Sequence, residues 1–151
     1  MEKLVIQSDI NNLIEVERFV CGVCDSYNVN NYAAAISMSV LKAAENAIIH
    51  GNKSDAGKQV TITSDFSRGG LYFCVSDQGD GFNYSEYGNT LPLDGKGTGL
   101  FMMRTLADKI SFSDNGSTVR LDYIINGIDS SHALERIVTL RKLFMPQMVN
   151  A

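Results

Sequence analysis

The sequence predicts an α+β two-layer sandwich in which helices cover one face of a mixed, mainly antiparallel sheet. Two patterns support this fold class. Two long segments near the N-terminus repeat apolar residues at helical spacing, whereas several short segments alternate apolar and polar residues as strands do. Short glycine-containing turns join these strands in pairs, and such turns favour antiparallel hairpins. Helices with one apolar face then bury it against the sheet.

The first half of the chain is expected to hold one strand and two helices. Residues 3–7 form the strand. Asp9 or Asn11 can cap a helix that runs to about residue 27. Asn30 or Asn31 can cap the next helix, which covers residues 32–50, and Gly51 is expected to end it.

The second half is expected to hold two hairpins separated by a loop and a helix. The predicted strands cover residues 58–66, 71–76, 110–113 and 118–125, the loop 82–95, and the helix 98–108. An apolar helix is also expected over residues 129–145. We therefore expect one domain over residues 1–125 and a C-terminal extension over residues 126–151, which packs on that domain or on a partner.

Composition narrows the class of protein. The chain has 151 residues, of which 44% are apolar, and a net charge of −4 without a long basic run. These values favour one globular domain and no direct binding of nucleic acid. No signal peptide or membrane-spanning stretch is evident, so we expect a cytoplasmic protein with no membrane contact. Cys21 and Cys24 have redox-motif spacing, but they lie in a helical segment, where packing in the core is the favoured interpretation.

Two polar positions stand out against this background. Asn46 interrupts an apolar helix face, where its carboxamide either ties the helix to a loop or donates an oxygen to Mg²⁺. Asp77 ends a strand and precedes Gly79 and Gly81. This segment is either a simple turn or a flexible backbone that approaches a flat ligand, whose exocyclic amine the carboxylate would bind.

A third segment is rich in glycine. Gly95, Gly97 and Gly99 alternate directly before a predicted helix. Backbone N–H groups in such a loop and at a helix N-terminus bind phosphate, although the same glycines can serve only to reverse the chain. The segment follows a loop, so it does not match the dinucleotide-binding fingerprint, which follows a strand.

In combination the three segments resemble the ATP-binding boxes of the gyrase, Hsp90, histidine kinase and MutL superfamily. Residues 46–51 (NAIIHG) resemble the asparagine box, residues 77–82 (DQGDGF) the first glycine box, and residues 97–100 (GTGL) the second. The His-Gly ending and the short loop between glycine boxes are similar to one branch, the anti-sigma factor serine-protein kinases of bacterial partner-switching systems. The resemblance covers residues 3–123 and implies the Bergerat-type ATP-binding fold.

The resemblance implies roles for individual residues. Asn46 would coordinate Mg²⁺, and Asp77 would bind the adenine amine in a pocket shaped by Gly79 and Gly81. Residues 82–95 would form a lid over the nucleotide. The remaining implied nucleotide-binding residues are His50, Lys96, Gly97, Thr98, Gly99, Leu100 and Ser117.

One position departs from the family. A glutamate usually stands four residues before the box asparagine and acts as the general base, but Lys42 occupies that position here. A lysine ammonium does not accept a proton at neutral pH. Glu45 is the nearest carboxylate and is the candidate catalytic residue, although its direction on the helix is rotated by about 60°.

The resemblance implies a regulatory protein that binds ATP or ADP with Mg²⁺. Its partners would be a sigma factor, an anti-anti-sigma protein, or both, and it would phosphorylate a serine on the latter; a homodimer is possible. Because Lys42 replaces the usual base, a nucleotide-dependent switch with little or no kinase activity is the alternative. A scaffold that binds no nucleotide is less favoured.

Overall fold

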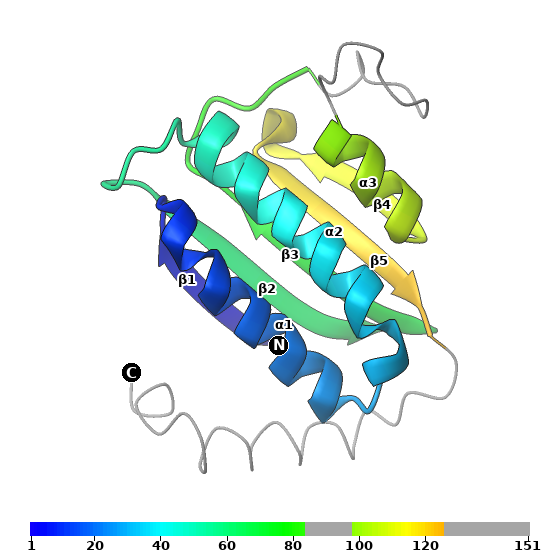
Figure 1. Ribbon diagram of the computed structural model, residues 1–151. Coiled ribbons are helices and arrows are strands. Elements are labelled where there is room, and N and C mark those ends of the chain that lie inside the picture. Colours follow the sequence, from blue (N-terminus) through cyan, green and yellow to red (C-terminus); the bar gives the residue numbers. More distant parts are fainter. Residues whose placement is uncertain (84–97, 126–151) are drawn as a thin grey trace.

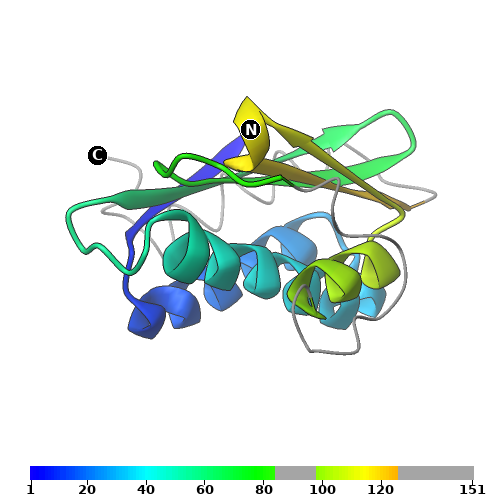
Figure 2. The same ribbon diagram turned by 90° about the horizontal axis from the view of Figure 1, so that it is seen from above.

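The structure is a two-layer α+β sandwich, as the sequence predicts. A computed structural model describes residues 1–83 and 98–125. Figure 1 shows the helices side by side on one face of the sheet, and Figure 2 shows the sheet and the helices as separate layers. Most of the predicted lid and the whole C-terminal extension lie outside the described residues.

Five strands form a single sheet in the order β1-β2-β3-β5-β4. The strands are β1 (Glu2–Gln7), β2 (Gln59–Ser67), β3 (Gly70–Ser76), β4 (Lys109–Ser113) and β5 (Thr118–Ile124). Every pairing between these five strands is antiparallel. The parallel pairs that a mixed sheet would contain are therefore missing from the described part of the chain.

In the described part of the chain, three α-helices cover the sheet, namely α1 (Leu13–Ser26), α2 (Ala33–Asn46) and α3 (Thr98–Leu106). Asp9 caps a short 3-10 turn (Ile10–Asn12) that leads into α1, because its side chain accepts a hydrogen bond from the backbone N–H of Asn11. The predicted cap at Asp9 or Asn11 is therefore not on α1 itself, which has Asn12 at its N-cap position without a side-chain hydrogen bond. The α3 helix ends two residues earlier than predicted. Asp108 lies beyond this end and donates its backbone N–H to the carbonyl of Asp122, 2.9 Å away.

The second predicted helix changes its winding near its end. It is regular to Asn46 and continues as a π-helical turn, η3 (Ala47–Gly51). The backbone N–H of Asn52 donates to the carbonyl of Ala47 at 2.8 Å, which closes this wider turn. Single π-turns within helices are rare, and they occur frequently at functional sites.

The core fills the space between the helices and the sheet. The rings of Phe19, Phe73 and Tyr123 stack edge to face, with centroids 6.2 and 6.3 Å apart. Cys24 is fully buried in this core and Cys21 is exposed, so core packing is the correct interpretation of Cys24. Burial, helped by the neighbouring Cys21, raises the pKa of the Cys24 thiol to about 12, which keeps it protonated. None of the described helices is long and apolar enough to cross a membrane.

Candidate functional site

The end of the asparagine helix packs directly against the first glycine turn. The backbone of Gly51 lies so close to the Asp77 carboxylate that a β-carbon on Gly51 would overlap it. A β-carbon on Gly79 would in turn overlap the carbonyl oxygen of Gly51. Both positions therefore require glycine. Gly51 and Asp77 are 26 residues apart in the sequence, yet the segments that contain them pack directly against each other.

The Asp77 carboxylate is held in a defined orientation at the end of β3. Its Oδ1 accepts the backbone N–H of Gly79 at 2.8 Å, and its own backbone N–H donates to the carbonyl of Ser117 at 2.9 Å. Within residues 1–83 and 98–125, no group donates a hydrogen bond to Oδ2, which is the carboxylate oxygen nearest to Gly51. Burial raises the pKa of this carboxyl, while the Gly79 N–H and the charge of Lys58 oppose the rise.

Asn46 lies beside the first turn of α3. A β-carbon on Gly99 would stand 3.2 Å from Nδ2 and 3.3 Å from Oδ1 of Asn46, so glycine lets the helix approach the carboxamide. No described residue forms a hydrogen bond with this carboxamide. The α3 helix begins at Thr98, and the first N–H groups of any helix lack partners within it. An amide oxygen and backbone N–H donors thus lie together.

The far side of the first glycine turn contacts the β4–β5 connection. Gly81 has a φ of +82°, and a β-carbon there would overlap the carbonyl of Asn115. The backbone N–H of Phe82 donates to that same carbonyl at 2.9 Å. In this connection the hydroxyl of Ser117 donates to the carbonyl of Asp114 at 2.8 Å. The main-chain carbonyl of Ser117, rather than its hydroxyl, therefore supports Asp77.

The remaining predicted site residues differ in exposure. His50 is exposed, whereas the side chain of Leu100 is only 4% exposed and packs in the core. Any contact between Leu100 and a ligand would therefore come from its main chain. Lys96 and Gly97 lie outside the described residues. The structure thus brings Asn46 to Gly99 and Asp77 to Gly51 and Gly79, while the roles of these residues toward a nucleotide stay predictions.

Lys42 and Glu45 form an ion pair on α2. Lys42 Nζ lies 3.2 Å from Glu45 Oε2, and the two side chains are 37% and 39% exposed. Such exposed pairs contribute at most about 1 kcal/mol to stability. The ammonium group nevertheless engages the only carboxylate that sequence reasoning offers as a base. A proton acceptor at Glu45 would first have to leave this pair.

Asn52 is the site residue that sequence reasoning missed. It directly follows the asparagine box and is 1% exposed. Its side-chain Oδ1 accepts the backbone N–H of Gln78 at 2.7 Å, and its Nδ2 donates to Ser8 and to the carbonyl of Gln59. The only signal in the sequence is a polar residue after a helix-ending glycine, which is also typical of an ordinary loop.

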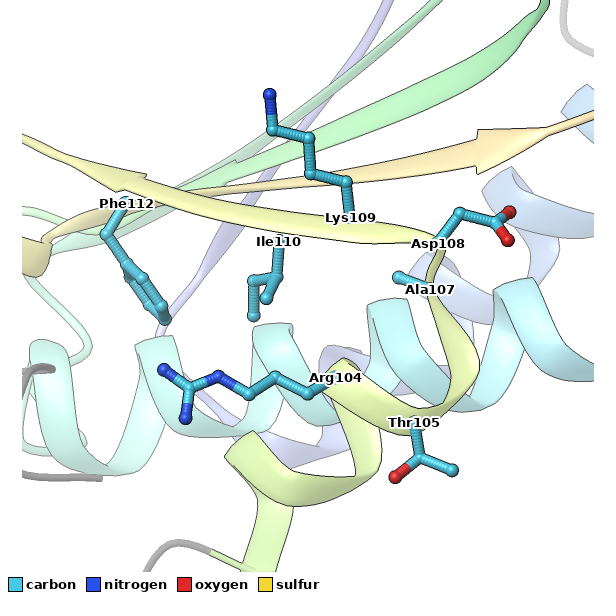
Figure 3. Close-up of a pocket in the computed structure, with 7 residues that line it drawn as sticks. All are labelled: Arg104, Thr105, Ala107, Asp108, Lys109, Ile110 and Phe112. Carbon is cyan, nitrogen blue, oxygen red and sulfur yellow. The ribbon is translucent and has the colours of Figure 1, made fainter. Parts of the chain in front are cut away.

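A pocket of about 480 Å³ lies elsewhere, between α3 and β4. Figure 3 shows the Arg104 side chain extending from α3 along Ile110 and Phe112 of β4. No predicted site residue lines this pocket. Asp108, the acidic residue among those that line it, accepts the backbone N–H of Ile124 at 2.6 Å. The motifs therefore do not converge on this pocket.

The described residues contain no group of three or more His, Cys, Asp or Glu side chains placed to hold a metal ion. A cation at Asn46 would need oxygen ligands in addition to this amide. Mg²⁺ is commonly held in this way, by few protein oxygens together with phosphate and water.

Comparison with known proteins agrees with the fold. Serine-protein kinase RsbW of Bacillus subtilis (strain 168) is 28% identical over 108 residues, which are 64% of this chain and 68% of that protein. Serine-protein kinase RsbW of Bacillus licheniformis is 29% identical over 102 residues, 60% of this chain and 64% of that protein. The histidine kinase-like ATPase domain matches residues 6–123, most of the chain. The chain therefore belongs to the histidine kinase-like ATPase domain family.

Proposed function

We propose that this protein binds ATP with Mg²⁺ and acts as an anti-sigma-factor-like regulator that phosphorylates a serine of an anti-anti-sigma partner. The observation that carries the nucleotide proposal is the orientation of Asp77. Its carboxylate is held against Gly51 and Gly79, and no described residue donates a hydrogen bond to Oδ2. The similarity to serine-protein kinases supports the finer proposal of serine phosphorylation.

The residues present fit a magnesium–nucleotide complex. Asp77 supplies an acceptor for the exocyclic amine of adenine, and the glycines around it let the neighbouring segments pack closely against its carboxylate. Asn46 supplies a hard oxygen for Mg²⁺, and the N-terminus of α3 at Thr98 and Gly99 supplies N–H donors for phosphate oxygens. Bound Mg²⁺ would neutralise phosphate charge. The predicted contributions of Lys96 and Gly97 would add positive charge and backbone donors.

The same site also favours a second function, a nucleotide-dependent switch with little or no kinase activity. The supporting observation is the Lys42–Glu45 ion pair, because Glu45 would have to leave the Lys42 ammonium before it could reach a substrate hydroxyl. Loss of a general base typically lowers a rate by about 10²–10⁴-fold, whereas nucleotide binding does not depend on that base. Partner binding gated by ATP or ADP would then remain.

Two measurements test these functions. The melting temperature is recorded with and without Mg·ATP, because a ligand that binds only the native state stabilises it. We expect a rise at millimolar Mg·ATP; no rise would refute both functions. Transfer of the γ-phosphate from radiolabelled ATP to a candidate anti-anti-sigma protein then separates the kinase from the switch. Complex formation with a sigma factor and light scattering of the free protein test the predicted partners and homodimer.

A further inference from the structure

A group of two buried and two exposed polar residues joins the asparagine helix to the adenine-side turn. This group, the Asn52 cluster, consists of Asn52, Ser8, Gln59 and Gln78. Asn52 Nδ2 donates to Ser8 Oγ at 2.7 Å and to the Gln59 carbonyl at 2.9 Å. The Gln59 N–H donates to Gln78 Oε1, and the Gln78 N–H donates to Asn52 Oδ1, both at 2.7 Å. Asn52, Gln59 and Gln78 thus form a closed ring of hydrogen bonds.

The cluster joins four segments of the chain at one point. Ser8 follows β1, Gln59 begins β2, Gln78 follows β3, and Asn52 follows the π-helical turn. Ser8 also donates its hydroxyl to the Lys58 carbonyl at 2.9 Å. Both polar atoms of the buried Asn52 amide are satisfied, and a fully satisfied buried network fixes one arrangement of its members.

The position of Gln78 makes this arrangement important for the site. Gln78 lies between Asp77 and Gly79. The backbone N–H of Gly79 donates to the Asp77 carboxylate and orients it. Without the bond from Gln78 to Asn52, the backbone after Asp77 would lose an anchor on the side facing the asparagine helix. The remaining anchors of Asp77 would be its bonds to Ser117 and Gly79.

We propose that Asn52 is a positioning residue for base recognition, because it fixes the turn that aims Asp77 Oδ2 at the exocyclic amine of adenine. The inference rests on the proposed nucleotide binding and adds to it a determinant of base specificity. Asn52 does not touch the nucleotide in this proposal. It acts through Gln78 and Asp77, so its removal weakens recognition of the amine more than binding of the phosphates.

The test is a double-mutant cycle between the protein and the ligand. Affinities for Mg·ATP and for Mg·purine riboside triphosphate, which lacks the amine at position 6, are measured by calorimetry. The proteins are the wild type, Asn52→Ala and Gln78→Ala. Gln78 is exposed, so Gln78→Ala removes one bond of the ring without burying an unpaired group. Ser39→Ala is the matched control, because Ser39 is fully buried in α2 and bonds to Tyr123, away from the cluster.

We expect the wild type and Ser39→Ala to bind ATP about tenfold more tightly than the analogue, as one well-aligned hydrogen bond to a charged group provides. In Asn52→Ala this preference should fall to about twofold or less, with an intermediate value in Gln78→Ala. A merely structural role would lower the affinities for both ligands equally and leave the preference intact. The inference is overturned if a folded Asn52→Ala variant keeps the preference for ATP over the analogue. If Asn52→Ala does not fold, an unchanged preference in Gln78→Ala overturns it instead. A wild type that binds neither ligand would instead refute the proposed function.

Discussion

Replacing Gly51 by alanine tests the contact between the asparagine helix and the first glycine turn. The new β-carbon would overlap the Asp77 carboxylate, so one of two changes must follow. If the carboxylate rotates away, it loses the hydrogen bond from the Gly79 N–H. A hydrogen bond to a charged acceptor contributes about 1.5–3 kcal/mol to the free energy of unfolding. If the helix end shifts instead, overpacking costs about 1–3 kcal/mol.

Alanine also lowers the conformational entropy of the unfolded chain, which stabilises the folded protein by about 0.4–1 kcal/mol and offsets part of this loss. The net loss for Gly51→Ala is therefore about 1–2 kcal/mol. For a domain of this size, each kcal/mol lowers the melting temperature by about 2–4 °C. We expect a fall of roughly 2–8 °C in thermal unfolding, together with loss of the further rise that Mg·ATP causes in the wild type.

Gly22 provides the matched control for this substitution. It lies inside α1, and a β-carbon built on it meets nothing within 4 Å. Gly22→Ala should raise stability by about 0.5–1 kcal/mol and keep the full effect of Mg·ATP. The reasoning is refuted if Gly51→Ala is as stable as Gly22→Ala, or if both respond equally to the nucleotide.

Three further substitutions or modifications give distinct outcomes. Asp77→Asn should abolish the Mg·ATP-induced rise in melting temperature. Burial raises the pKa of Asp77 in the folded protein, so the charged carboxylate opposes folding. The free energy of unfolding of Asp77→Asn, compared with that of the wild type, should therefore increase as the pH rises above 3.8, the ordinary pKa of the group. Urea titrations in which this difference shrinks with rising pH would contradict the prediction. Lys42→Glu should increase phosphate transfer or hydrolysis at retained ATP affinity, and equal rates would show that a missing base does not limit the reaction. A thiol reagent at pH 8 should label Cys21 quickly and Cys24 only after unfolding, since the pKa of Cys24 is about 12; mass spectrometry showing equal labelling would contradict its burial.

The fold could be predicted from the sequence because its signals are local. The apolar periods of α1 and α2 and the glycine turns between strands each lie within a short window. The order of the strands, with β5 between β3 and β4, is a result of tertiary packing. The antiparallel pairing of all five described strands is also a result of tertiary packing. The short turns predicted it only for the strands that they join directly.

The site was predictable in its members and less so in its contacts. Sequence reasoning singled out Asn46 because its amide interrupts an apolar helix face, and Asp77 because its carboxylate ends a strand directly before two glycines. The close approach of Gly51 to Asp77 depends on the π-helical turn, and no residue type in that turn predicts its winding. Asn52 was missed for the same reason, since its partners lie 7, 26 and 44 positions away in the chain.

The π-helical turn also sets how the chain can change its length here. Deleting one residue within Ala47–Gly51 would let ordinary α-helical winding resume, which is locally more favourable. The Asn52 N–H now donates to Ala47 five residues back, so the shortened chain would restore the four-residue spacing of an α-helix between the same two groups. Residues after the deletion would therefore keep nearly their present direction, and Asn52 would stay near Gln78. The turn thus holds one residue more than regular winding needs, and that extra residue is accommodated within Ala47–Gly51 without turning the chain that follows.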